Sequence, residues 1–248
     1  KEAPFVVHAE NCTDGTNEWL VENKEKYKLT PIIEPHNDTV RGIGGGMNLC
    51  AENVYTEYMM FLHSDFYVTN NWDLACYEEI KKHKEPTWVF SHRIEPNMFN
   101  SPERAGTAFV PGNYFGEYHH NFDSASFDEF AKDFVELNDF TVPKAEGVSG
   151  LISKIDWDRV GGNDPIFSPT SWEDMDLFLR MLNQGYKFVL TSKSVVWHFG
   201  ARGSHRLEEN GGKTSERQRM AEEANVHKWL KKWGKMPVFD QYGMIKYF

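Results

Sequence analysis

Two titratable side chains stand directly after apolar runs, where strand ends would hold them at the edge of a sheet. Asp65 follows residues 57–62, and His198 follows residues 195–197. A carboxylate at the mouth of a buried strand suits a hard divalent cation, although the position alone equally allows a residue that only starts a turn or caps a helix. A histidine at a strand end is more often packed or hydrogen-bonded than bound to metal, and both roles stay open for His198.

Three acids open a predicted helix over residues 172–183. Glu173 has capping-box spacing from Thr170, and Asp176 can form an ion pair one helical turn later, so both have a purely structural interpretation. Asp174 has neither, and the helix dipole would keep its carboxylate ionised. An ionised carboxylate here could act as a general base that takes a proton from an acceptor hydroxyl.

A glycine-rich loop at residues 41–46 precedes a predicted helix over about residues 47–54. Its glycines would let the backbone approach a phosphate closely, and the first amides of the helix would be free to bind it. The loop matches neither the P-loop nor the dinucleotide-binding fingerprint. Arg41 could contact a diphosphate or be a plain surface charge.

Strands and helices alternate along the N-terminal half of the chain. The predicted strands cover residues 5–8, 30–34, 57–62 and 87–91, and the predicted helices cover residues 17–26, 47–54 and 73–83. This alternation implies a largely parallel sheet in an α/β fold, where ligands bind beyond the carboxyl ends of the strands. The loops at residues 8–14, 41–46 and 63–65 follow predicted strands, so we expect them to line one edge with the active site.

The second half begins with an irregular stretch at residues 95–147, which we expect to carry specificity rather than chemistry. Further elements are predicted at residues 127–137, 150–154, 172–183 and 186–197, with a final helix that ends near Trp233. The polar loop at residues 200–213 is expected to be a mobile lid over a bound diphosphate.

Composition excludes several classes of function. The chain of 248 residues has a formal net charge of -10, and an acidic surface repels nucleic-acid backbones. The three cysteines lie far apart, which indicates neither a disulfide framework nor a zinc site. No apolar run approaches the ~20 residues that span a bilayer. Without a signal peptide, a cytoplasmic location is the default expectation.

Taken together, these segments resemble family 2 of the glycosyltransferases, which have the GT-A fold. The resemblance covers about residues 5–90 and 147–234, and its motifs lie at residues 6–16, 41–48, 61–65, 147–187, 195–198 and 231–234. It implies a single GT-A domain over residues 1–248. In that domain residues 1–94 would bind the nucleotide sugar, 95–146 would be an insertion, 147–234 would bind the acceptor and carry the catalytic groups, and 235–248 would be a C-terminal tail.

The resemblance also implies a reaction. A sugar would pass, with inversion, from a nucleotide diphosphate donor to a hydroxyl of a glycan or glycoconjugate. Asp65 and His198 would bind Mn²⁺ or Mg²⁺, and Asp174 would be the base of a single in-line displacement. The implied nucleotide-sugar contacts are Glu10, Arg41, Asn48 and Ser64, and the implied acceptor contacts are Gly150, Trp172 and Glu173.

The chain departs from the family pattern in three places. His63 replaces the first acid of the D-x-D metal motif, and Ala9 stands where an aspartate usually holds the nucleobase, so that role is assigned to Glu10. The family's first strand, central in its sheet, would precede residue 5. Because its loss would leave two unpaired strand edges, we expect about 30–60 further N-terminal residues or another segment in that place.

Two other functions fit parts of the same pattern. A retaining GT-A enzyme similar to the polypeptide N-acetylgalactosaminyltransferases also pairs a metal-binding acid with a late histidine. A catalytically inactive GT-A module would only bind sugar or nucleotide. A metal-dependent hydrolase built on His119 and His120 is more remote, because adjacent histidines point in different directions in any regular element.

Overall fold

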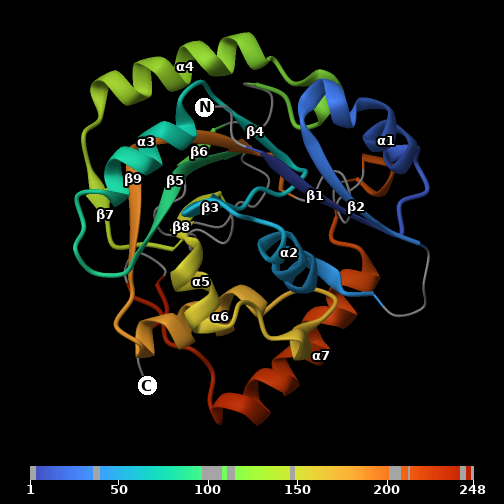
Figure 1. Ribbon diagram of the computed structural model, residues 1–248, viewed down its shortest axis with the longest axis vertical. Helices are drawn as coiled ribbons and strands as arrows, with labels where there is room; N and C mark the ends of the chain where they lie inside the picture. The colour runs from blue at the N-terminus through green and yellow to red at the C-terminus, as the bar shows by residue number, and fades with distance from the viewer. Residues whose placement is uncertain are drawn as a thin grey trace.

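The computed structural model describes residues 4–35, 40–96, 108–110, 115–145, 149–200, 208–211, 213–240 and 244–246. Within these residues the chain forms two β-sheets flanked by seven α-helices, which confirms the predicted α/β class (Figure 1). In the same part of the chain no helix is long and apolar enough to cross a bilayer. The three cysteines are free thiols, in line with their wide spacing.

A small sheet holds the two N-terminal strands, β1 (Phe5–Glu10) and β2 (Leu29–Glu34), in parallel. The helix α1 (Thr16–Tyr27) connects them, as the alternating pattern predicts. The register places Glu10 opposite Glu34, so both carboxylates lie at the same end of the sheet. Among the described residues β1 pairs only with β2, and the further strand expected beside it stays a prediction.

The larger sheet is mixed. Its strand order is β3 (Tyr58–Met60), β8 (Gly150–Ser153), β5 (Thr87–Pro96), β9 (Lys187–His198) and β4 (Phe66–Val68), with β6 (Ala108–Val110) beside β5 and β7 (Thr141–Val142) beside β9. The long strands β5 and β9 run parallel at its centre, whereas β4 pairs antiparallel with β9. This antiparallel pair brings the start of β4 to the end of β9.

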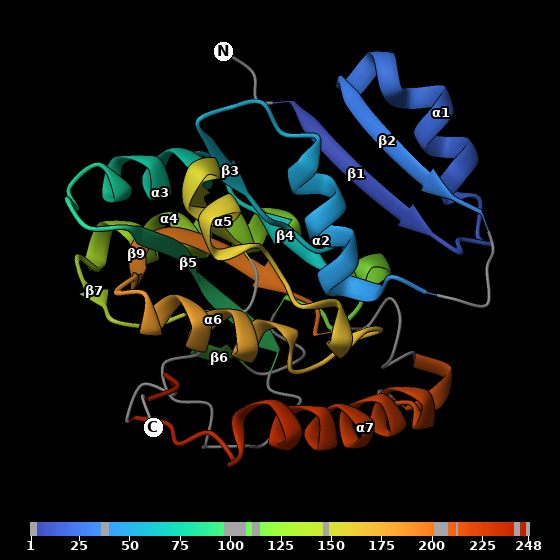
Figure 2. The same ribbon diagram turned by 60° about the horizontal axis from the view of Figure 1, so that its bottom comes forward.

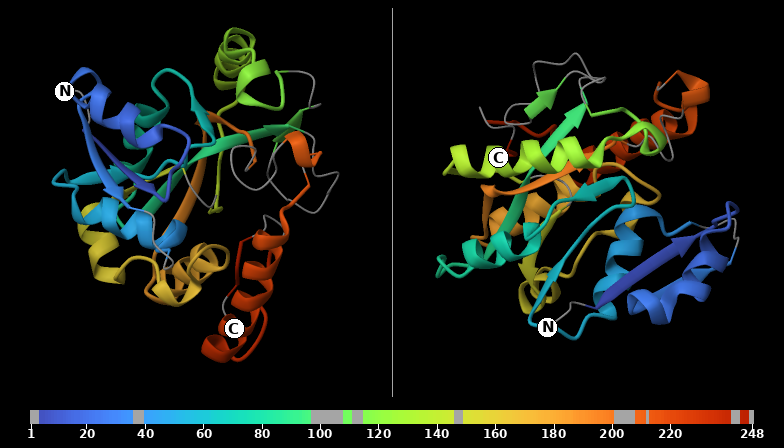
Figure 3. Two further views of the ribbon diagram at one scale, coloured as in Figure 1. Left: turned by 90° about the vertical axis from the view of Figure 1, so that its right-hand side faces the viewer. Right: turned by 90° about the horizontal axis from the view of Figure 1, so that it is seen from above.

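Helices cover both faces of the larger sheet. Trp88 and Phe90 of β5 pack against Phe178 of α6 (Glu173–Asn183), in a core that also contains α5 (Lys154–Val160). Val89, which points to the other face, packs with α3 (Trp72–Ile80). The helix α4 (Ser124–Leu137) covers the remainder of that second face, on the opposite side of the sheet from α6 (Figure 3).

Two further helices pack beside the sheets and the segment that precedes α6. The helix α2 (Gly42–Glu52) packs on β1, and α7 (Glu216–Trp233) runs beside the segment that leads into α6 (Figure 2). Trp229 of α7 is fully buried in the core around α6, so α7 belongs to the same packed body. Short 3-10 helices are formed by His119–Asn121, Pro165–Phe167 and Glu208–Asn210.

Several local predictions are wrong. The glycines at positions 42 and 44–46 lie in the first turns of α2 rather than in a loop before it. The helix α5 was not predicted, because its seven residues are too few for a clear period. No capping box forms at Glu173, since Trp172 takes the N-cap position and makes no side-chain cap. Most of the predicted lid at residues 200–213, and much of the insertion at residues 95–146, lies outside the described residues.

Candidate active site

The antiparallel pairing of β4 with β9 brings Asp65 and His198 together. Phe66 pairs with His198 in the strand register, so Asp65 lies one residue before the paired position. The Asp65 Oδ2 atom lies 3.0 Å from Nε2 of His198, and the backbone oxygen of Asp65 accepts a hydrogen bond from the Phe199 amide at 2.8 Å. The Phe66 ring stacks on the imidazole at a centroid distance of 4.4 Å. Two residues 133 positions apart therefore form one fixed pair.

A second carboxylate lies behind the imidazole. Glu95 of β5 is fully buried, and its Oε1 atom is 2.5 Å from Nδ1 of His198 and 3.1 Å from Nε of Arg93. Burial lowers the pKa of His198, but its hydrogen bonds to Asp65 and Glu95 outweigh burial and raise the pKa above the usual value. Glu95 thereby fixes the ring orientation that directs Nε2 toward Asp65.

These residues fit a divalent cation. Carboxylate oxygens suit manganese and magnesium, histidine is a common metal ligand, and a carboxylate behind the imidazole is the usual orienting partner of a metal-bound histidine. His63 lies beside the pair, and burial lowers its pKa to about 4, so the ring is neutral. Its buried Nε2 atom has no hydrogen-bond partner among the described residues. The departure at His63 therefore adds a neutral nitrogen where the family pattern has an acid.

A second polar cluster lies at the start of α2 and joins Glu10 to Arg41. Glu10 accepts hydrogen bonds from the amides of Arg41 at 2.5 Å and of Gly42 at 2.9 Å. Glu34 accepts from Nε of Arg41 at 2.7 Å and contacts Nε2 of His8 at 2.8 Å. One ligand atom from each of His8, Glu10 and Glu34 lies within 4.8 Å of the others, but Arg41 and the amides already occupy these carboxylates. The cluster is thus a carboxylate network that holds Arg41 in place.

In the acidic pair at the start of α6, Glu173 is buried and Asp174 is half-buried. Glu173 is 8% exposed, and its Oε2 atom has no partner in the described part of the chain. Burial and the neighbouring Asp174 raise the pKa of Glu173 to about 8. Burial also raises the pKa of Asp174, whose Oδ1 atom accepts a hydrogen bond from the Met175 amide at 2.7 Å. The two carboxyl groups titrate as a coupled pair.

Arg93 links the acidic pair to the histidine. Its positive charge acts on both Asp174 and His198 and lowers the pKa of each, although it is not the main influence on either. The guanidinium therefore lies within electrostatic reach of the two groups. Arg93 is thus a charged group that the surroundings of Asp174 and His198 have in common.

The other predicted site residues lie in different surroundings. Asn48 exchanges two hydrogen bonds of 2.8 Å with the backbone of Asn163, so its amide is used within the protein. Ser64 is exposed in the turn before β4. Gly150 packs inside the core, where a Cβ atom would lie 2.5 Å from Nε1 of Trp88. The Trp172 ring lies 5.3 Å from the ring of Trp229 on α7.

Sequence reasoning missed Arg93 and Glu95. The strand predicted at residues 87–91 continues to Pro96, and it places Glu95 in a buried position and Arg93 in a partly buried one. Charged side chains that directly follow a strongly apolar strand were the available signal. Asp176, by contrast, has the structural role that its spacing indicates, because it pairs with Arg180 at 2.8 Å and with Lys232 at 2.6 Å.

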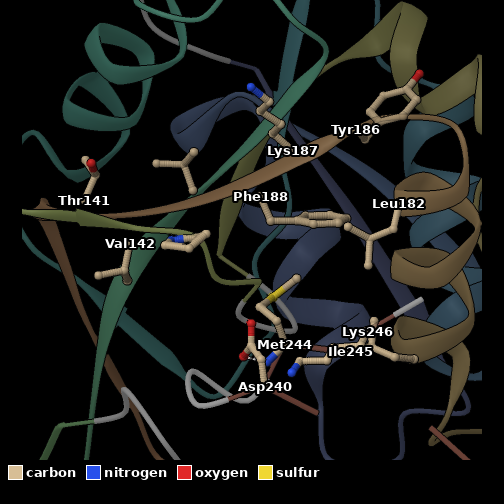
Figure 4. A pocket seen from close by; sticks show the side chains of 12 residues that line it. Thr141, Val142, Leu182, Tyr186, Lys187, Phe188, Asp240, Met244, Ile245 and Lys246 are labelled. Carbon is tan, nitrogen blue, oxygen red and sulfur yellow. Dashed lines mark hydrogen bonds between the residues drawn. The ribbon is translucent and has the colours of Figure 1, made fainter. Parts of the chain in front are cut away.

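A cavity of about 780 Å³ lies away from these residues, between β7, the end of α6, the first residues of β9, Asp240 and residues 244–246 (Figure 4). Phe188, Leu182 and Met244 form its apolar floor. None of the predicted site residues lines it.

Comparison with known proteins identifies the family and the fold of the chain. The model of the family described as glycosyl transferase family 2 matches residues 6–133, just over half of the chain. An uncharacterized protein of Mycobacterium tuberculosis is 37% identical over 73 residues, which is 26% of this chain and 28% of that protein. An uncharacterized protein of Mycobacterium bovis matches over the same extent. The chain thus spans little more than a quarter of these relatives.

Two solved structures share the fold. GalNAc-T7, solved with UDP, GalNAc and Mn²⁺, has a TM-score of 0.54 at 14% identity, over 79% of this chain and 37% of that chain. TarS from S. aureus has a TM-score of 0.52 at 13% identity, over 80% of this chain and 31% of its own. The fold is therefore the GT-A type predicted from the sequence.

Proposed function

The chain belongs to glycosyl transferase family 2, and from that membership we propose that it moves a sugar from a nucleotide diphosphate donor to a hydroxyl of a glycan or glycoconjugate. The observation that carries this proposal is the contact of Asp65 with His198 at 3.0 Å. Such a pair can hold a cation that binds a diphosphate, and Asp174 would supply the proton acceptor.

Asp65 and His198 would hold Mn²⁺ or Mg²⁺, and the ion would supply positive charge to the departing diphosphate. Glu95 keeps His198 oriented for this role through the 2.5 Å contact with Nδ1. The similar structure of GalNAc-T7 was solved with Mn²⁺ and UDP, which supports a metal-assisted donor site. Arg41, fixed by Glu34 and near Glu10, would face the nucleotide or diphosphate, with Asn48 and Ser64 completing that side.

Asp174 would be the general base. It takes the proton of the acceptor hydroxyl while the hydroxyl oxygen forms a bond to the anomeric carbon and the bond from that carbon to the diphosphate oxygen breaks. One displacement of this kind inverts the anomeric centre. The raised pKa of Asp174 supports the role, since a carboxylate with a higher pKa is a stronger base. Trp172, Glu173 and Gly150 would lie on the acceptor side.

In this proposal residues 1–94 form the donor half of one GT-A domain, residues 147–234 form the acceptor half, and residues 95–146 are an insertion. The division is supported by the separate polar clusters at Arg41 and at Asp174.

Turnover of a panel of UDP-, GDP- and dTDP-linked sugars with Mn²⁺ tests the proposal. We expect release of a nucleoside diphosphate from at least one donor, and loss of that release with EDTA. NMR of the product made from an α-linked donor should show a β-linkage. An α-linked product would indicate a retaining enzyme, and no turnover or binding of any donor would contradict the proposal.

A further inference from the structure

The entry into α6 has a strained backbone. Ser171 and Trp172 both have a φ angle of 75°, in the left-handed region that residues with a Cβ atom rarely adopt. Trp172 takes the N-cap position of the helix without a side-chain cap. Two consecutive left-handed residues directly before the acidic pair need support from another part of the chain.

That support comes from Asn225 of α7. Its side chain is fully buried, and Nδ2 donates to the carbonyl oxygens of Phe167 at 2.6 Å, Thr170 at 2.8 Å and Ser171 at 2.9 Å. Three carbonyl oxygens around one amide nitrogen fix the orientation of the side chain, since the flipped amide would direct its oxygen at all three. A buried asparagine is a poor choice for a helix interior, and its hydrogen bonds to this loop account for it.

Other residues on the same face of α7 reinforce the contact. Nε2 of Gln218 lies 2.9 Å from Oγ of Ser171, and the ring of Trp229 lies 5.3 Å from that of Trp172. The spacings of seven and four residues in the order 218, 225 and 229 place the three side chains on one side of the helix. The helix therefore holds the loop at residues 167–172 along its length.

The same loop also touches the donor side. The carbonyl oxygen of Pro169 accepts a hydrogen bond from the Ile43 amide at 3.0 Å, and Oγ of Ser168 donates to the carbonyl oxygen of Val40 at 2.7 Å. Gly42 permits this approach, because a Cβ atom there would lie 1.8 Å from the Pro169 oxygen. The loop thus fixes the start of α2, beside Arg41, relative to the start of α6.

We propose that Asn225 is a positioning residue for sugar transfer: it holds the left-handed turn at Ser171 and Trp172, and thereby sets the place of Asp174 relative to the donor side. The proposal rests on the proposed function of Asp174 as the base. Asn225 itself is buried beneath the loop and acts through it.

The test compares Asn225→Asp with Asn225→Gln in the full chain, using the donor that the panel identifies. Aspartate has the same shape but cannot donate to the three carbonyl oxygens, whereas glutamine keeps the amide. Because a displacement of about 1 Å can cost about 100-fold in rate, we expect kcat to fall about 10- to 100-fold in Asn225→Asp, with the KM for the donor within about twofold of wild type. Asn225→Gln should lose less of the wild-type kcat than Asn225→Asp.

Two control variants separate positioning from general stability. Glu223→Gln changes an exposed side chain on the same helix, and Ile80→Val removes a methyl group from the core under α3. Both should keep the wild-type kcat, even where Ile80→Val lowers the melting temperature. A wild-type kcat in Asn225→Asp would overturn the proposal, as would an equal loss in Ile80→Val.

Hydrogen exchange keeps this test separate from the test of the proposed function. In Asn225→Asp we expect faster exchange at the Asp176 amide, which donates to the Trp172 carbonyl at 3.0 Å in the first turn of α6. Unchanged exchange there would contradict the positioning role, even if wild-type protein turned over no donor. If Asp174→Asn retained full turnover, the assignment of the base would fail, while the exchange result would still decide whether Asn225 holds the turn.

Discussion

The two halves of the candidate site are built in different ways. Asp65 directly precedes β4 and His198 ends β9, two paired strands, and each side chain has a charged partner within hydrogen-bond distance. Glu173 and Asp174 follow a left-handed turn held by α7, and burial raises the pKa of both. A cation site needs an ionised carboxylate and a neutral imidazole held in fixed positions, whereas a base needs an elevated proton affinity. The fold therefore gives Asp65 and His198 hydrogen-bond partners, whereas it removes water from Glu173 and Asp174 without a full set of partners.

The largest effect is expected at the base. Asp174→Asn should lower kcat by about 100- to 10,000-fold, because the amide cannot accept the proton of the acceptor hydroxyl. Donor binding, measured by calorimetry, should stay within a few-fold of wild type. Asp158→Asn, an exposed acid on α5, is the matched control and should keep full turnover. Retention of turnover in Asp174→Asn would show that Asp174 is not the base, and the two halves would then not differ in the way described.

The next largest effect is expected in the metal affinity of the Asp65 and His198 pair, through Glu95, which contacts His198. Glu95→Gln should weaken Mn²⁺ affinity about 10- to 100-fold, since orienting partners of metal ligands typically contribute that much. Titration of Mn²⁺ by paramagnetic relaxation measures this without turnover. Glu129→Gln, at an exposed position on α4, should leave the affinity unchanged. Equal affinities for Glu95→Gln and wild type would show that the ring of His198 needs no orienting carboxylate.

The sequence predicted these halves unequally. Asp65 and His198 were found because apolar runs end at each of them, which is a local signal. The contact between them depends on an antiparallel pairing that the expected parallel sheet does not contain, and Glu95 was found only when β5 proved longer than predicted. Asn225 left no local signal, because its role depends on carbonyl groups more than 50 residues away.

The glycines at the start of α2 show a similar limit. Their number predicted a phosphate-binding loop, yet Gly42 and Gly44 are helical residues that make room for Pro169 and for the side chain of Glu173. A Cβ atom on Gly44 would lie 3.3 Å from Cβ of Glu173. Sequence shows that side chains are absent at these positions, but it does not show which distant segment takes the space.

The pH dependence of kcat should report the coupled acids. The base is active when ionised, and burial raises the pKa of Asp174, so turnover should rise with pH through a midpoint above the ordinary carboxyl range. Glu173 stays protonated and neutral below its pKa of about 8 and is not among the groups that shift the pKa of Asp174, so Glu173→Gln should leave this midpoint in place. The comparison uses kcat measured from pH 5 to 9 with saturating donor. A midpoint near 4 in wild type would mean that Asp174 is solvated like an exposed acid.

The smallest effect is on stability. Burial and Asp174 raise the pKa of Glu173 from 4.5 to about 8, so the folded state is favoured by the protonated acid below pH 4.5, and this stability is lost as the pH rises to about 8. Glu173→Gln does not titrate and should melt several degrees above wild type at pH 9, with the difference gone at pH 4. A constant difference across this range would show that the Glu173 carboxyl is not the titrating group.

Calorimetric titration of UDP into wild type and Asp65→Asn, each in Mn²⁺ and in EDTA, tests the metal-assisted donor site directly. Mn²⁺ should strengthen UDP binding to wild type by at least about tenfold and leave the variant unaffected, because Asp65 would hold the ion that binds the diphosphate. Equal UDP affinity in Mn²⁺ and EDTA for wild type, or a full Mn²⁺ effect in Asp65→Asn, would contradict it.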